Sequence, residues 1–164
     1  MPCGTGKTMT ILSFLVAYRR QCPALVEKIV YCTRTVPEML KVVEELRDLV
    51  SYYQESGINL DLLSVSLSAR TNMCINPDVA SCSNRLEVDL ECRKRTATFA
   101  RRNAKMSPNR TDLVRCGFFE TLQQKTLSDV MPRGIYNLED LKQFGKEANL
   151  CPGLENSMPL IYFI

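Results

Sequence analysis

Apolar residues recur at helical spacing in two segments of the first third of the chain. In residues 8–20 the apolar positions are Ile11, Leu12, Leu15 and Val16. This spacing predicts a helix that ends before Pro23. A second helix is predicted to begin at Thr35-Val36-Pro37-Glu38, which has capping-box spacing and a proline suited to a first turn. Its apolar stripe consists of Met39, Val43, Leu46, Val50 and Tyr53, and Gly57 can end it.

Two short β-rich runs alternate with these helices. Residues 28–32 (KIVYC) suit a buried strand, and residues 62–67 (LLSVSL) predict a second one. The order loop, helix, strand, helix, strand predicts parallel pairing in an α/β sheet.

The character of the chain changes near Arg70. Residues 70–116 show little periodicity and contain ten Lys and Arg against five Asp and Glu. This change in composition predicts an inserted subdomain. A short capped helix is expected from Asn137 to Gly145.

Composition restricts the possible chemistry. The chain has eight cysteines and no histidine, so Ser-His and Cys-His catalysis and mixed Cys/His zinc sites are excluded. The apolar run at residues 9–18 is too short to span a bilayer and has no cleavage site after it. No membrane association is therefore expected, and the cysteines are interpreted as thiols or metal ligands in a reducing compartment.

The segment Gly4-Thr5-Gly6-Lys7-Thr8 has the form of the second half of a phosphate-binding loop. Glycines let backbone N–H groups converge on phosphate oxygens. Lys7 is expected to reach the β- and γ-phosphates of ATP, and Thr8 to ligate Mg²⁺. The alternative is a Gly/Thr turn that happens to precede a helix.

Four cysteines, Cys74, Cys92, Cys116 and Cys151, are separated by 18, 24 and 35 residues. No pair has the CxxC spacing of zinc knuckles. Four scattered thiolates suit a [4Fe–4S] cluster, but the residues alone favour the alternative of buried or partly buried free thiols.

Basic residues crowd just after Cys92. If residues 90–105 form a helix, Arg95 and Arg102 share one face, and Arg93 also belongs to this basic run. Such a face can follow a phosphate backbone, although a solvated helix face is the common alternative.

Several motifs together resemble the XPD family of iron–sulfur DNA helicases. They are MPCGTGKT, IVYCTRTVPEMLKVVEEL, LSARTNMCINP, RCGFFE and GIYNLEDLK, and the resemblance covers residues 1–152. It implies a partial RecA-like motor domain with a parallel sheet over residues 1–69. It also implies a mainly helical iron–sulfur subdomain over residues 70–152, followed by a divergent tail at residues 153–164.

The resemblance also implies functional residues. The family's cluster ligands fall on Cys74, Cys92, Cys116 and Cys151, with Cys82 as a rival. Single-stranded DNA is expected to contact Arg34 and Thr35, which match motif Ia, and Arg70, Arg93, Arg95 and Arg102 in the cluster region. The alternatives are that Thr35 only caps its helix and that Arg70 supports the cluster.

The implied activity is ATP-dependent 5′-to-3′ unwinding in transcription initiation and excision repair, in the nucleus, with the other subunits of the factor TFIIH. The family's DEAH box and second motor domain do not occur in these residues, so we expect the chain alone to be inactive as an ATPase. Two alternatives are a stand-alone iron–sulfur nucleic-acid-binding module and a non-functional truncated product.

Overall fold

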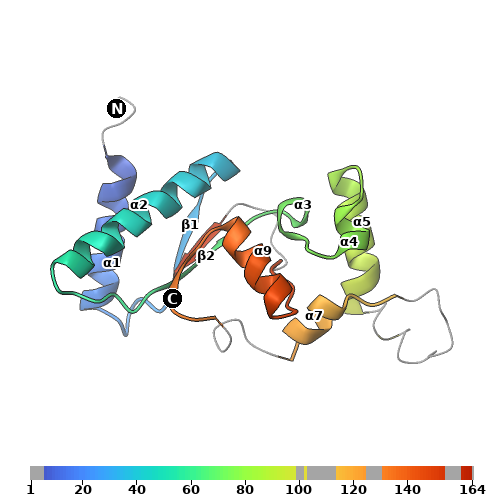
Figure 1. The fold of residues 1–164 in the computed structure, drawn as a ribbon. Coiled ribbons are helices and arrows are strands. Elements are labelled where there is room, and N and C mark those ends of the chain that lie inside the picture. Colours follow the sequence, from blue (N-terminus) through green and yellow to red (C-terminus); the bar gives the residue numbers. More distant parts are fainter. Residues whose placement is uncertain (1–5, 99–101, 103–113, 125–130, 154–159, 164) are drawn as a thin grey trace. The chain divides into compact units, whose positions relative to one another are not determined.

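The computed structural model describes residues 6–98, 102, 114–124, 131–153 and 160–163. The chain divides into two compact units (Figure 1). The first, here called the sheet unit, comprises Met1–Leu67, Pro132–Asn137 and Met158–Ile164. The second, here called the cysteine unit, comprises Ser68–Met131 and Leu138–Ser157.

Two helices of the sheet unit follow the predicted pattern. Helix α1 spans Lys7–Gln21 and buries Leu12 and Val16. Helix α2 spans Val36–Glu55, and the Thr35 hydroxyl accepts a hydrogen bond from the Glu38 backbone N–H at 3.3 Å. The buried residues of α2 are Met39, Val42, Val43, Leu46 and Leu49, so its apolar stripe is wider than the sequence pattern indicated. None of the described helices is long and apolar enough to cross a membrane.

The described residues form one sheet of four strands in the order β1-β4-β2-β3. Their bounds are Ile29–Cys32 for β1, Leu63–Leu67 for β2, Gly134–Tyr136 for β3 and Leu160–Phe163 for β4. Strands β2 and β3 pair in parallel, although no strand was predicted at β3. The two predicted strands, β1 and β2, do not pair with each other. Strand β4 lies between β1 and β2 and is antiparallel to both. The α/β class is therefore confirmed, but the sheet is mixed because the tail, for which no strand was predicted, supplies one of its two inner strands.

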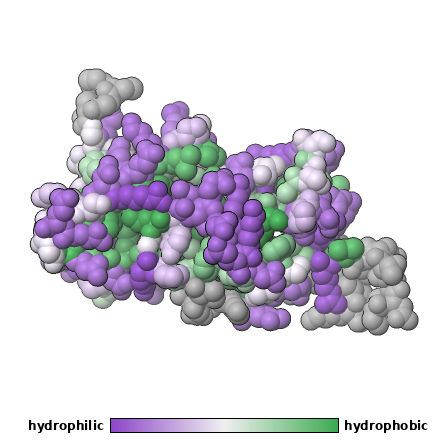
Figure 2. Space-filling model, in the orientation of Figure 1, coloured by the Kyte–Doolittle hydropathy of each residue, from purple (hydrophilic) through white to green (hydrophobic). Residues whose placement is uncertain are grey.

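The described helices of the cysteine unit are mostly short. Their bounds are Arg70–Met73 for α3, Pro77–Ala80 for α4, Arg85–Thr96 for α5, Gly117–Leu122 for α7 and Leu138–Glu147 for α9. The buried apolar side chains of this unit include Met73, Val79, Val88, Met131, Leu138, Leu141 and Leu150. Helix α9 confirms the expected helix and extends it to Glu147, and its visible face is mostly hydrophilic (Figure 2).

The expected helix over residues 90–105 is wrong in its bounds. Helix α5 begins after the N-cap Asn84, whose side chain accepts the Glu87 N–H, and it ends at Thr96 because Ala97 is extended. Threonine and alanine alternate at Thr96-Ala97-Thr98, and threonine is a weak helix former. Arg95 and Arg102 therefore do not share a face of one helix.

Candidate functional site

The described part of the predicted phosphate-binding loop is its junction with α1. Gly6 is the N-cap and has φ +69°, a left-handed conformation that favours glycine. Lys7 begins the helix, Thr8 follows it, and the first turn contains no acidic side chain. Unpaired N–H groups at a helix start attract anions, and this turn also carries a lysine. Gly4 and Thr5 lie outside the described residues.

Four elements of the cysteine unit each position one predicted cluster ligand. Cys74 follows the last turn of α3, and Cys92 belongs to α5. Cys116 is the N-cap of α7, and Cys151 follows α9. All four line one cavity of about 20 Å³, although up to 35 residues separate neighbours in the sequence.

Asn76 connects two of these segments. Its side-chain oxygen accepts the Asp78 backbone N–H at 3.0 Å and so caps α4. Its Nδ2 donates to the Cys116 sulfur at 3.6 Å. The Cys74 thiol lies 4.0 Å from the backbone carbonyl oxygen of Asn76. This one amide thus holds the segment after Cys74 against the start of α7.

The turn after α9 places Cys151. Asn149 has φ 53°, and the Leu150 N–H donates to the Gly145 carbonyl at 2.8 Å, which is the Schellman pattern of a helix end. The Cys151 N–H then donates to the Phe118 carbonyl at 2.9 Å. These bonds direct the chain from α9 to α7.

Burial and nearby cysteines disfavour the charged form of two of these thiols, Cys74 and Cys151. Burial raises the pKa of Cys74, and it raises the pKa of Cys151 to about 12, with smaller contributions from the neighbouring cysteines. A bound cation reverses this effect, because it stabilises the thiolate form.

The cysteines do not form a site for a single ion. The described residues contain no group of three or more His, Cys, Asp or Glu side chains positioned to hold one metal ion. All seven described cysteines are free thiols. The donor set of four thiols around one space suits a larger body that separates its ligands, although the cavity must widen to admit an iron–sulfur cube.

The predicted DNA-binding arginines differ in burial: Arg70 and Arg95 are partly buried in ion pairs, whereas Arg34 is exposed and pairs with Glu38 at 3.5 Å. Arg70 forms an ion pair with Asp89 at 3.1 Å. Arg95 forms ion pairs with Glu91 at 2.6 Å and Asp78 at 3.9 Å. The exposed arginines are Arg34, Arg93 and Arg102.

Cys82 stays outside the four-cysteine cavity. It lies near enough to Cys74 to raise the pKa of that thiol slightly, but its own sulfur lies 3.8 Å from the Asp78 carbonyl. The residues around the cavity therefore offer no support for Cys82 as a rival ligand.

A model of the DEAD_2 family matches residues 31–155, three quarters of the chain. The chain belongs to the DEAD_2 family. The DEAD_2 match includes all four cavity cysteines together with Arg34 and Thr35, whereas Lys7 and Thr8 precede it.

Named relatives of this DEAD_2 chain are helicase subunits. The chain is 42% identical over 153 residues to the Arabidopsis thaliana "General transcription and DNA repair factor IIH helicase subunit XPD". It is 36% identical over 154 residues to the Dictyostelium discoideum protein of the same name. Each alignment covers 93% of this chain and about a fifth of the relative. The predicted resemblance to the XPD family is thus confirmed.

A more distant relative is the human "Regulator of telomere elongation helicase 1", which is 28% identical over 132 residues. That alignment covers 80% of this DEAD_2 chain and 9% of the relative.

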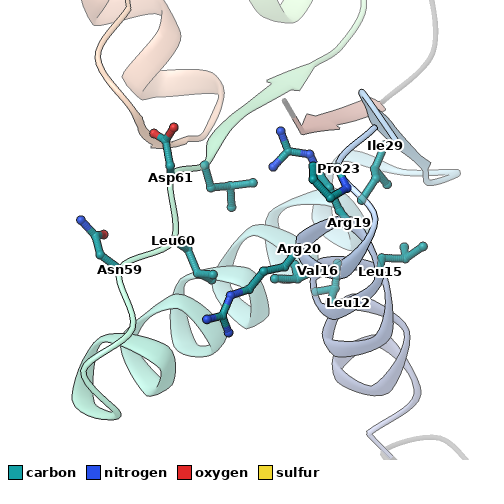
Figure 3. Close-up of a pocket in the computed structure, with 11 residues that line it drawn as sticks. Leu12, Leu15, Val16, Arg19, Arg20, Pro23, Ile29, Asn59, Leu60 and Asp61 are labelled. Atoms are coloured by element: carbon teal, nitrogen blue, oxygen red, sulfur yellow. The ribbon is translucent and has the colours of Figure 1, made fainter. Parts of the chain in front are cut away.

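The sheet unit of this DEAD_2 chain has a larger cavity of about 340 Å³ (Figure 3). Apolar side chains of α1 and of the segment before β2 form much of its wall, and Arg19, Arg20 and Asp61 add charge. None of the predicted site residues lines this cavity.

Sequence reasoning missed the residues that support the cysteines in this DEAD_2 chain. Asn76, Gly145 and Asn149 each have a local signal, since Asn-Pro, a helical glycine and a helix-end asparagine are recognisable patterns. For the partners of Arg95 the sequence signal is weaker. Glu91 lies four residues before Arg95, a spacing that favours an ion pair on a helix, whereas Asp78 has no such local spacing.

Proposed function

We propose that this chain provides the nucleotide-binding and iron–sulfur regions of an ATP-dependent DNA helicase of the XPD type. The observation that carries the proposal is the gathering of Cys74, Cys92, Cys116 and Cys151 around one cavity. If these thiols were buried only by chance, nothing would make these four cysteines share a cavity that excludes Cys82. The names of the relatives support the helicase assignment.

In this proposal the RecA-like motor domain contributes the start of α1. The backbone N–H groups of its first turn and the Lys7 ammonium bind the phosphates of ATP, while the Thr8 hydroxyl ligates Mg²⁺. These groups bind and orient the nucleotide. Hydrolysis also needs a carboxylate and a group that positions water.

The cysteine unit is proposed to hold a [4Fe–4S] cluster on its four thiolates. A bound cluster would supply a redox-active centre that cross-links α3, α5, α7 and the turn after α9. Exposed cations, namely Arg34, Arg93 and Arg102, would bind the phosphates of single-stranded DNA. The Thr35 hydroxyl caps α2. Thr35 and Arg34 therefore both lie at the N-terminus of this helix, a position that favours a bound phosphate.

By the same family argument, the cellular setting is the nucleus, with the other subunits of the TFIIH complex as partners. The proposal also includes the 5′-to-3′ direction of unwinding. Because the sequence contains no histidine, it contains no DEAH box. We therefore expect the isolated chain to show no DNA-stimulated ATPase. Clear turnover that Lys7→Ala abolishes would contradict this expectation.

The test is the iron and acid-labile sulfide content of the anaerobically purified chain, with circular dichroism to establish folding. We expect about four of each per folded chain. Serine substitution at each of the four cavity cysteines should lower the iron content, whereas Cys82→Ser and Cys32→Ser should preserve it. A folded wild-type chain without iron would refute the proposal. Single-stranded DNA binding that persists without iron would favour a nucleic-acid-binding module that needs no cluster.

A further inference from the structure

Arg95 is a cation at the wall of the four-cysteine cavity. Its side chain is only 14% exposed, and it lines the cavity together with Cys74, Cys92, Cys116 and Cys151. Arginine is rarely this buried unless it is paired or serves a ligand. A side chain in this position is poorly placed to contact DNA phosphates.

The ion pairs of Arg95 connect two cysteine-bearing segments. Glu91 lies one turn earlier on α5, the helix that carries Cys92. Asp78 belongs to α4, which follows Cys74 by only a few residues. The guanidinium therefore bridges the Cys74 segment to the Cys92 helix.

One donor of Arg95 remains unused. Its Nε–H is buried and has no hydrogen-bond partner among the described residues. A buried donor on a charged group without a partner is costly, which favours an acceptor that binds there. Such an acceptor could bind in the cavity that Arg95 lines together with the four cysteines.

We propose that Arg95 is a positioning residue for the group bound by the four cysteines, holding their segments together and stabilising the group's negative charge. This inference rests on the proposed cluster. Four thiolates and a cluster form an anionic body, and a fixed cation beside it favours the reduced, more negative state. Arg95 thus helps to set the reduction potential and is not a DNA contact.

Lys94 provides a matched control. Its Nζ also pairs with Glu91, at 2.6 Å, but the side chain is 58% exposed and does not line the cavity. Replacing Lys94 removes one positive charge next to Arg95 and perturbs the same carboxylate. A difference between the two variants therefore reports on the cavity and not on net charge.

The experiment compares full-length wild type, Arg95→Gln, Lys94→Gln and Arg95→Lys after anaerobic purification. Iron content, the rate of iron loss in air and the midpoint potential of the bound cluster are measured by absorption and electron paramagnetic resonance. For Arg95→Gln we expect a more negative potential and faster iron loss. Lys94→Gln should match wild type, and Arg95→Lys should restore much of the potential because it keeps the charge.

Three results would overturn the inference. One is an Arg95→Gln variant that binds iron with the wild-type potential and stability, and another is an equal shift in Lys94→Gln. If Arg95→Gln binds no iron, the Arg95→Lys variant is the deciding test. It keeps the positive charge, so the proposal is also contradicted if this variant binds no iron. A folded wild type without iron refutes the cluster itself, so the two failures are distinguishable.

Discussion

Gly145 determines how closely the turn that carries Cys151 can approach α9. A Cβ atom at this position would lie 2.7 Å from the Leu150 carbonyl oxygen. It would also lie 3.2 Å from Ile75 Cδ1 and from Pro152 Cδ. The closest atom belongs to the backbone, so rotation of a side chain cannot relieve the contact. Gly145→Ala should therefore displace the turn.

The expected cost follows from two opposing effects. Overpacking of a buried position costs about 1–3 kcal/mol. Alanine in place of glycine inside a helix recovers about 0.5–1 kcal/mol of that. We expect a net loss of roughly 1–2 kcal/mol in the free energy of unfolding. For a chain of this length, each kcal/mol corresponds to a decrease of about 2–4 °C in the melting temperature.

Gly117→Ala is the matched control. Gly117 is also in a helix of the cysteine unit, but no atom lies within 4 Å of the position of its added Cβ. Thermal and urea denaturation of both variants, followed by circular dichroism, measure the difference. Iron content adds a second readout, because a displaced Cys151 should bind iron less well in Gly145→Ala. Equal stability and equal iron content in the two variants would refute the reasoning.

Three further predictions concern α2 and DNA binding. Thr35→Ala removes the N-cap hydrogen bond of α2 and should cost about 1 kcal/mol in urea denaturation, whereas Ser51→Ala in the same helix should be nearly neutral. Leu46→Ala should cost about 2–5 kcal/mol because Leu46 is fully buried, and an equal loss for the more exposed Leu40→Ala would contradict this. If Arg93 contacts a phosphate, Arg93→Ala should reduce the slope of log affinity for single-stranded DNA against log salt by about 0.7, and an unchanged slope argues against the contact.

Local patterns explain which elements could be predicted. Helices α1, α2 and α9 and strands β1 and β2 follow from periodicity and caps, because the residues that specify each one are neighbours in the sequence. The bounds of α5 could not be predicted as well. The basic residues in this part of the sequence continue beyond Thr96, the last residue of α5. Nothing in that polar pattern indicates that the backbone becomes extended at Ala97.

The candidate site shows the same division. The cysteines stood out because of their number and the absence of histidine, but their role as a set came only from the resemblance to a family. Their gathering depends on Asn76, on the turn at Asn149 and on the packing of α3 against α5 and α9. The turn at Asn149 is local, but the Asn76 bond and the helix packing join segments far apart in the chain.

By itself the sequence determined the α/β class, the loop-to-helix junction at Gly6 and Lys7, and the residue types that can bind metal. Those properties depend on local spacing and on side-chain chemistry. Only the tertiary structure decided that the tail strand β4 lies inside the sheet and that Arg95 lies at the cysteine cavity. The physical reason is that strand pairing and the burial of charge depend on non-local partners, which a pattern along the chain does not identify.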